Sequence, residues 1–274
     1  MSIVAAIQLA SGPNIEANLL EVDRLIAAAV AKGAKLIVLP ENFALMGMSE
    51  TDKLRLSERM GEGRIQDFLS KRASDHEIWI VGGTLPLQCS DPDRVYATSL
   101  VYNAKGEVAA RYDKIHLFDV ELSGTGERYN ESATIKAGDK VVVVDSPFGR
   151  LGVAVCYDLR FPEMFRAMLD RGVEVVALPA AFTAVTGKAH WEILIRARAI
   201  ENLVYVIAAG QGGYHVNGRK THGYSMIVDP WGSILDRFQQ GSGMALAPLD
   251  LAFLETTRRN FPAIEHRRLN PGVT

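Results

Sequence analysis

Short apolar segments alternate with amphipathic segments along most of this chain, and this alternation limits the possible folds more than any other feature. Residues 3–9 are apolar except for Gln8, as expected for a strand that is covered on both faces. Residues 22–30 then place apolar side chains at helical spacing, and Gly33 stands where a helix C-cap is expected. The pattern predicts the α/β class, with buried strands and helices packed on them.

The same alternation continues towards the C-terminus. Further buried strands are predicted at residues 36–39, 78–81, 141–144, 151–155, 173–178 and 203–209. Further helices are predicted around residues 65–69, 162–169 and 190–202. Because no linker rich in Ser, Gly or Pro interrupts the pattern, we expect residues 1–274 to form a single domain.

Two hairpins and one long loop complete the expected secondary structure. Residues 94–102 and 107–112 are predicted to pair, as are residues 224–228 and 233–238. The second hairpin turns at Asp229-Pro230-Trp231-Gly232, which suits a type I turn. Residues 117–138 are polar and show no period, so we expect a long loop there, and loops of this length are usually functional.

Charge and cysteine content narrow the classes of partner. Thirty basic and 32 acidic residues give a formal net charge of −2, which provides no attraction to nucleic acid or to an anionic membrane. Two cysteines cannot form a disulfide framework, and this favours a reducing, cytoplasmic location. No apolar run approaches the roughly 18 residues of a membrane span. The N-terminal residues lack a basic region before their apolar run, so we do not expect them to act as a signal peptide.

The basic C-terminal stretch, residues 257–268, has two readings. It carries Arg258, Arg259, Arg267 and Arg268. In a nearly neutral chain such a stretch is expected to be a solvated, basic end. A contact between subunits is the alternative.

Cys156 is the first candidate for chemistry. It follows an apolar strand and precedes a predicted helix. A thiol at such a corner is expected to have an exposed sulfur near backbone N–H groups and the positive end of a helix, which favour the thiolate. A small hydrophobic residue that ends a buried strand is the alternative.

Three charged residues follow strands in a similar way. Glu41 comes just after the strand at 36–39, at the strand end where α/β sheets place ligand sites, and it could serve as a general base. Lys114 follows the strand at 107–112, and a fixed ammonium can stabilise an oxyanion. Glu131 is a weaker candidate in the long loop. Taken singly, each could also be a solvated surface residue.

Other catalytic arrangements have less support. A Cys–His pair could use His116 or His190, but spacing selects neither. The chain has no His-x-x-x-His, His-Glu-x-x-His or Cys-x-x-Cys pattern, so we expect no metal. It also lacks a Gly-x-Gly-x-x-Gly segment, a Walker loop and a Gly-x-Ser-x-Gly elbow. We therefore expect no cofactor, no nucleotide site and no serine hydrolase site.

Three segments together resemble the signature segments of the nitrilase superfamily, whose members hydrolyse carbon–nitrogen bonds. They are Pro40-Glu41-Asn42, Lys114-Ile115-His116-Leu117 and Cys156-Tyr157-Asp158-Leu159-Arg160. Their order and flanks match, and the similarity runs along nearly the whole chain. Residues 179–183, 190–192, 196–202 and 225–232 match as well.

The resemblance implies a four-layer α-β-β-α sandwich that pairs into homodimers. It assigns Cys156 as the nucleophile, Glu41 as general base and acid, and Lys114 as the oxyanion stabiliser. Glu131 matches the family's second glutamate, which has a structural or positioning role. The implied reaction partners are a small amide substrate and water, and the implied intermediate is a thioester.

Several matched residues are candidates for substrate binding. The backbone N–H of Tyr157 would help Lys114 to hold the oxyanion, and Phe182 and Thr183 belong to a matched segment. Arg160 could bind a substrate carboxylate, or it could pair with Asp158 or Glu163 to secure the turn.

The sequence also resembles one branch of the superfamily in particular. Residues 161–163, 225–229 and 265–268 look most like the amidases that act on deaminated glutathione. The ω-amidases that act on 2-oxoglutaramate or succinamate are the nearest alternative, followed by nitrile or carbamoyl hydrolases and acyltransferases of the same scaffold. A non-catalytic protein is disfavoured because all three chemical positions are intact.

Overall fold

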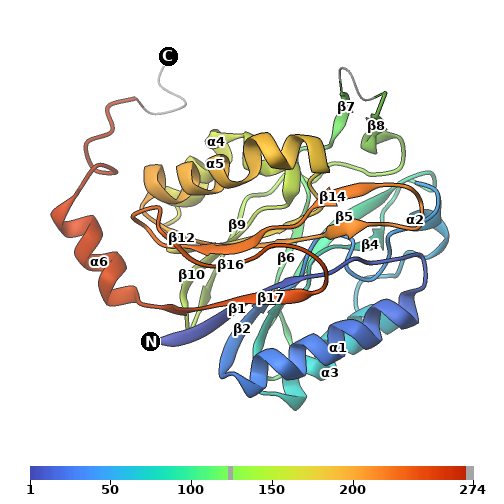
Figure 1. Ribbon diagram of the computed structural model, residues 1–274, viewed down its shortest axis with the longest axis horizontal. Helices are drawn as coiled ribbons and strands as arrows, with labels where there is room; N and C mark the ends of the chain where they lie inside the picture. The colour runs from blue at the N-terminus through green and yellow to red at the C-terminus, as the bar shows by residue number, and fades with distance from the viewer. Residues whose placement is uncertain (123–125, 270–274) are drawn as a thin grey trace.

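Two β-sheets packed face to face form the centre of the molecule, and helices cover their outer faces (Figure 1). The computed structural model describes residues 1–122 and 126–269. The first sheet has the order β17-β1-β2-β3-β5-β4, with β6 paired to β5. The second has the order β16-β15-β12-β11-β10-β9.

The strands of the first sheet come from both ends of the chain. They are β1 (Ser2–Gln8), β2 (Ala34–Val38), β3 (Trp79–Val81), β4 (Leu85–Gln88), β5 (Val95–Tyr102), β6 (Val108–Asp113) and β17 (Gly243–Leu249). The strands β1, β2 and β3 are parallel, and β5 is antiparallel to both β3 and β6. It follows that β2 and β6 run in the same direction and end at the same edge of the sheet.

The second sheet is built mostly from the second half of the chain. Its strands are β9 (Val142–Ser146), β10 (Gly149–Val153), β11 (Val175–Ala180), β12 (Tyr205–Gly210), β15 (Ser225–Val228) and β16 (Ile234–Phe238). Here β10, β11 and β12 are parallel, so their carboxyl ends also share one edge.

The alternation of side chains along the strands explains the layers. On β1, Ala5 and Ile7 pack in one apolar cluster with the inner faces of α1 (Ile15–Ala31) and α3 (Arg64–Asp75). Val4 and Ala6 point to the opposite face, into a second cluster shared with β10, β11 and β12. Successive strand residues point to opposite faces of a sheet, so a strand that is apolar throughout can be buried on both sides.

Helices close the outer face of the second sheet as well. These are α4 (Pro162–Leu169) and α5 (Ala184–Asn202), whose buried residues Phe165 and Trp191 join the cluster between the sheets and helices. Figure 1 shows α1 and α3 on one side of the sandwich and α4 and α5 on the other. The expected four-layer α-β-β-α arrangement is therefore confirmed.

Local signals fixed most element boundaries closely. The side chain of Asn14 accepts a hydrogen bond from the Ala17 N–H at the start of α1, and Gly33 after its end has a φ of +86°. A left-handed residue just past a helix is the usual position for glycine. The helix predicted from residue 190 begins earlier, at Ala184, where Thr183 caps it.

The expected loop at residues 117–138 was partly wrong. It contains a hairpin of β7 (Asp119–Glu121) and β8 (Arg128–Asn130), followed by the 3₁₀ turn η1 (Glu131–Ala133). Three-residue strands with polar side chains are too short to show a period, so the pattern did not reveal them. Residues 123–125 lie outside the described part of the chain.

The reading of the C-terminal arginines as solvated was wrong for Arg258. This residue lies on α6 (Leu251–Asn260), and its guanidinium donates to the carbonyl oxygens of Leu203 at 3.0 Å and Val173 at 2.7 Å. Arg267 pairs with Asp170 at 2.5 Å. The sequence pattern could not show these contacts because the partners lie far away along the chain.

No helix within residues 1–122 or 126–269 combines the length and the apolar content that crossing a bilayer requires.

Candidate active site

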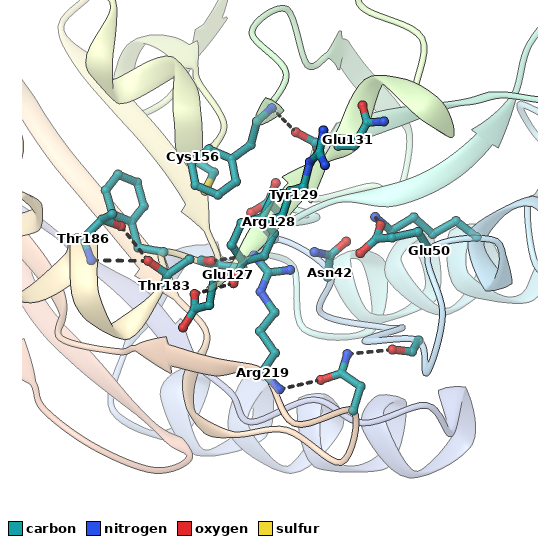
Figure 2. Close-up of a pocket in the computed structure, with 18 of the residues that line it drawn as sticks. Asn42, Glu50, Glu127, Arg128, Tyr129, Glu131, Cys156, Thr183, Thr186 and Arg219 are labelled. Atoms are coloured by element: carbon teal, nitrogen blue, oxygen red, sulfur yellow. Dashed lines mark hydrogen bonds and ion pairs between the residues drawn. The ribbon is translucent and has the colours of Figure 1, made fainter. Parts of the chain in front are cut away.

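Four chemically active side chains from four separate segments line one cavity of about 330 Å³. They are Glu41, Lys114, Glu131 and Cys156, all named above from the sequence. Figure 2 shows this cavity, with Cys156 and Glu131 among its labelled residues. The segments meet because β2, β6 and β10 all end towards the cavity.

The backbone around Glu41 is fixed from three sides. The Asn42 N–H donates to Thr84 Oγ1 at 2.9 Å, and Gln211 Nε2 donates to the Glu41 carbonyl oxygen at 3.0 Å. Gly83 has a φ of +52°, and a Cβ there would lie 2.1 Å from the Pro40 carbonyl oxygen. This close approach requires glycine, and it holds the turn after β2 in place.

Lys114 is the centre of a buried ionic group. Its Nζ lies 2.8 Å from Glu41 Oε1, and it lies 2.9 and 2.8 Å from the two carboxylate oxygens of Glu131. Only 1% of Lys114 is exposed, and 4% of Glu41. Burial alone would lower the pKa of Lys114, but the charges of Glu131 and Glu41 hold this pKa well above its usual value. The side chain is therefore an ammonium.

Glu131 is held by more than the lysine. Its Oε2 accepts a hydrogen bond of 2.7 Å from the Phe118 N–H. Burial alone would raise the pKa of Glu131, but the charges of Lys114 and then Lys53 bring it below its usual value. Glu131 is thus a carboxylate that fixes the position of the Lys114 ammonium.

Cys156 begins the 3₁₀ turn η2 (Cys156–Arg160), and its φ is +49°. Only 8% of the residue is exposed, so the expectation of an exposed sulfur was wrong. Burial raises the pKa of the thiol well above its usual value, the charge of Glu41 raises it further, and Lys114 opposes them. The expectation of a thiolate was therefore wrong, because burial and the charge of Glu41 favour the protonated thiol. The helix expected to stabilise a thiolate, α4, begins only at Pro162, beyond the turn.

Three of the four residues suggested for substrate binding line the same cavity: Arg160, Phe182 and Thr183. The Arg160 guanidinium carbon lies 5.2 Å from the centroid of the Phe182 ring, and its Nη1 lies 3.1 Å from His190 Nδ1. Arg160 pairs with neither Asp158 nor Glu163, so its charge faces the cavity rather than securing the turn.

The side chain of Tyr157 does not line the cavity. Its ring packs edge-on against Phe118 at 5.0 Å and Phe161 at 5.3 Å. Only its backbone N–H remains a candidate for contact with substrate.

The two histidines considered for a Cys–His pair are committed elsewhere. His116 Nδ1 lies 2.7 Å from Asp158 Oδ1, and its ring stacks on Phe161 at 3.7 Å. His190 contacts Arg160. Neither histidine lines the cavity. Nor does any cluster of three or more metal-ligating side chains occur among the described residues.

Sequence reasoning missed several other cavity residues. Arg219, Asn217, Tyr129 and Lys53 also line the cavity. Arg219 and Asn217 belong to a small hairpin, and Tyr129 belongs to β8. The segments that carry them are too short and polar to give a periodic signal, so only the tertiary structure brings them to the site.

Comparisons with known proteins agree with this geometry. A family model described as carbon-nitrogen hydrolase matches residues 3–259. The deaminated glutathione amidase of Synechocystis sp. (strain PCC 6803 / GT-S) is 42% identical over 268 residues, which cover 97% of each chain. These matches span almost the whole chain and include the strand ends that form the cavity.

Solved structures show the same fold. The Nit3 protein of Saccharomyces cerevisiae, described as a member of branch 10 of the nitrilase superfamily, has a TM-score of 0.88 and 32% identity. That match covers 98% of this chain and 97% of the yeast chain. An amidase from Nesterenkonia sp. AN1, in which acrylamide has added to the active site cysteine, has a TM-score of 0.77 and 26% identity and covers 97% of this chain and 100% of that one. The sequence, the sandwich fold and the full-length matches together show that the chain belongs to the carbon–nitrogen hydrolase family of the nitrilase superfamily.

Proposed function

We propose that this chain is a single-domain amidase that hydrolyses deaminated glutathione through a cysteine thioester, with Glu41, Lys114 and Cys156 as its catalytic residues. The observation that carries the proposal is the buried ionic group of Glu41, Lys114 and Glu131 in the cavity that also contains Cys156. The 42% identical relative that bears the name of this activity supports the substrate.

In the first half of the reaction, the Cys156 sulfur attacks the amide carbonyl carbon while Glu41 accepts the thiol proton. A base is needed because the buried thiol is protonated at rest. Negative charge then develops on the carbonyl oxygen, and Lys114 Nζ together with the Tyr157 backbone N–H stabilises it. Loss of one such donor typically costs about 10²–10³ in rate.

The tetrahedral intermediate collapses when the carbon–nitrogen bond breaks. Glu41 returns the proton to the departing nitrogen, which leaves as an amine, and the acyl group stays on the sulfur as a thioester. Glu41 then takes a proton from water, whose oxygen attacks the thioester carbon. The acid product leaves, and Cys156 recovers its proton from Glu41.

The charges around the cavity support a substrate with two carboxylates. The ionic group of one ammonium and two carboxylates carries a net charge of −1. The rest of the lining carries four cations (Lys53, Arg128, Arg160 and Arg219) and two anions (Glu50 and Glu127), so the whole lining is net positive by one charge. Deaminated glutathione carries one carboxylate on its 2-oxo acid half and one on its terminal glycine, whereas 2-oxoglutaramate and succinamate carry only one. The excess of positive charge favours the former.

Arg160 binds the carboxylate of the 2-oxo acid half in this proposal. It lies four residues after Cys156 on the same turn, so it reaches the short acyl portion of the substrate. Phe182 supports its guanidinium by a cation–π contact, and Thr183 lies beside Phe182 at the cavity wall.

A substrate panel tests the proposal. Purified enzyme is offered deaminated glutathione, 2-oxoglutaramate, succinamate and a simple nitrile, with 2-oxoglutarate, succinate or ammonia measured as the product. We expect the highest kcat/KM with deaminated glutathione. Preference for 2-oxoglutaramate would instead identify an ω-amidase. Cys156→Ala should abolish turnover without changing the circular dichroism spectrum, and wild-type activity in this variant would refute the nucleophile assignment.

We further propose that the enzyme works as a cytoplasmic homodimer. Its cysteines, Cys89 and Cys156, are both free thiols, which suits a reducing compartment. Ile193 on α5 and Trp231 are 69% and 59% exposed, and such apolar surface is available for a subunit contact.

A further inference from the structure

Arg219 is the most unusual cation in the cavity because of the way it is held. It precedes β14 (Lys220–His222), which pairs with β13 (Gly212–Tyr214) in a small hairpin. The Arg219 N–H donates to Asn217 Oδ1 at 3.0 Å, and Asn217 Nδ2 donates to the Gly47 carbonyl oxygen at 2.7 Å. Figure 2 shows the side chain extending from this hairpin towards Tyr129 and Glu127. The hairpin thus holds the arginine at the cavity wall.

The guanidinium of Arg219 is only partly satisfied. Its Nη2 donates to the Ala181 carbonyl oxygen at 3.1 Å, and its carbon lies 5.2 Å from the centroid of the Tyr129 ring. Its Nε is buried and has no hydrogen-bond acceptor in the part of the chain that the structure describes. A guanidinium has five N–H donors in a planar fork, so this one retains donors for a ligand.

A carboxylate is the ligand that such a group selects. Arginine binds carboxylates through two parallel hydrogen bonds, and these charge-assisted bonds are stronger than neutral ones. The Tyr129 face and the Ala181 carbonyl hold the plane of the guanidinium, which lowers the entropy lost when an anion binds. The site is therefore built to receive a planar anion.

We infer that Arg219 binds the terminal carboxylate of the departing cysteinylglycine half of the substrate. This inference rests on the proposed function and assigns the second of the two carboxylates. Arg160 is tied to the nucleophile turn, whereas Arg219 belongs to a separate hairpin. Both guanidinium groups contact the segment after β11, Arg160 at the Phe182 ring and Arg219 at the Ala181 carbonyl oxygen. Two arginines on separate elements provide one cation for each of the two substrate carboxylates in the cavity that contains Cys156.

A matched pair of substrates tests the assignment. One is deaminated glutathione, and the other is the same molecule with its terminal glycine carboxylate converted to a primary amide. Both release 2-oxoglutarate, so one assay serves for both. We expect wild-type enzyme to prefer the free acid by about 10- to 10²-fold in kcat/KM, as charge-assisted hydrogen bonds allow. Arg219→Gln should reduce this preference to about 2-fold or less, mainly through KM.

Two further variants separate the explanations. Arg219→Lys keeps the charge without the fork, and we expect it to retain an intermediate preference. Lys220→Gln removes an exposed cation of the same hairpin that does not line the cavity, and we expect the preference to persist at close to its wild-type value. The circular dichroism spectrum of each variant shows whether it is folded.

Two results would overturn the inference while leaving the proposed function intact. One is an Arg219→Gln variant that keeps the wild-type preference for the free acid. The other is an Arg160→Gln variant that loses the preference while Arg219→Gln keeps it, because Arg160 would then bind the terminal glycine carboxylate. Wild-type enzyme that hydrolyses neither substrate would overturn the proposed function, and this inference with it.

Discussion

At the scale of single residues, the protonation states of Cys156 and Lys114 depend on each other through Glu41. The carboxylate of Glu41 stabilises the Lys114 ammonium at 2.8 Å, and the same negative charge disfavours a thiolate on Cys156. A buried sulfur beside a buried carboxylate therefore stays protonated until substrate binds. This arrangement gives Glu41 a proton to accept at the moment when the sulfur attacks.

Replacing Glu41 by Gln should separate thiol reactivity from catalysis. Glu41→Gln removes the charge that raises the pKa of Cys156 and leaves Lys114 nearby, so the thiol should ionise at lower pH. We expect the pH profile of Cys156 alkylation by iodoacetamide to shift towards lower pH, while turnover falls by about 10²–10⁴-fold through loss of the general base. Peptide mass spectrometry distinguishes Cys156 from Cys89. A profile that is unchanged or moves to higher pH would contradict this view of the site.

At the scale of elements, one buried carboxylate joins the end of β6 to the turn η2. Asp158 is fully buried, and its two oxygens accept hydrogen bonds from the Tyr112 hydroxyl at 2.6 Å, the Val155 N–H at 2.8 Å and the His116 N–H at 3.1 Å. Tyr112 and His116 flank Lys114, and Val155 precedes Cys156. Asp158 therefore fixes the distance between the two catalytic segments, and it helps to hold the left-handed backbone of Cys156.

Removing one donor from this carboxylate should impair catalysis more than stability. Tyr112→Phe deletes the hydroxyl that donates a hydrogen bond to Asp158, and it preserves the aromatic ring. We expect kcat to fall by about 10-fold with little change in KM, because a shift of about 1 Å at a reacting group can cost up to about 10²-fold. The measurement is steady-state kinetics at equal enzyme concentrations, with folding checked by circular dichroism.

The chain offers a matched control for that variant. Tyr102 on β5 is also buried, but its hydroxyl has no hydrogen-bond partner among the described residues. Tyr102→Phe should leave kcat unchanged. Equal effects of the two substitutions on kcat would show that Asp158 has only a structural role. A lower melting temperature for Tyr112→Phe with wild-type kcat would show the same.

At the scale of the whole molecule, a buried polar network joins the ends of the two sheets beneath the site. Gln211, just after β12, bonds to Ser11, just after β1, and also to the Glu41 backbone. His215 extends the network from Ser11 to Thr221, with both ring nitrogens at 2.8 Å from their partners. The position of Glu41 therefore depends on how the two sheets pack together.

This network should make stability depend on pH in a defined direction. Burial lowers the pKa of His215, its hydrogen bond to the Ser11 backbone opposes this in part, and the charge of Arg219 lowers the pKa further. Burial also lowers the pKa of His222. Below about pH 6.5 the unfolded chain therefore binds protons that the folded chain does not. The free energy of unfolding should fall as the pH drops from about 6.5 towards the lowered folded-state pKa, and this contribution should be constant above pH 7.

Urea unfolding at several pH values measures this effect. His215 contributes at most about 1.4 kcal/mol per pH unit to the slope of the free energy of unfolding against pH. His215→Gln should show a shallower fall than wild type between pH 6.5 and 5. Parallel curves for the two proteins would show that His215 is not a source of the pH dependence.

Much of the architecture could be predicted because its signals are local. The apolar run at β1 and the helical spacing in α1 can be recognised from neighbouring residues alone. The positions of Glu41 and Cys156 just after strands can be recognised in the same way. The failures share a cause. The β7–β8 hairpin is too short to show a period, and the contacts of Arg258 are with carbonyl groups 55 and 85 residues away.

The sequence by itself determined the α/β alternation, the strand ends that carry Glu41, Lys114 and Cys156, and a resemblance specific enough to imply the chemistry. These features depend on residue type and spacing along the chain. Only the tertiary structure decided that Cys156 is a buried thiol, that Lys114 lies between two carboxylates, and that Arg219 faces the same cavity. The physical reason is that burial and Coulomb interactions depend on distances in space, and Lys114 and Glu41 are 73 residues apart in sequence but 2.8 Å apart in the fold.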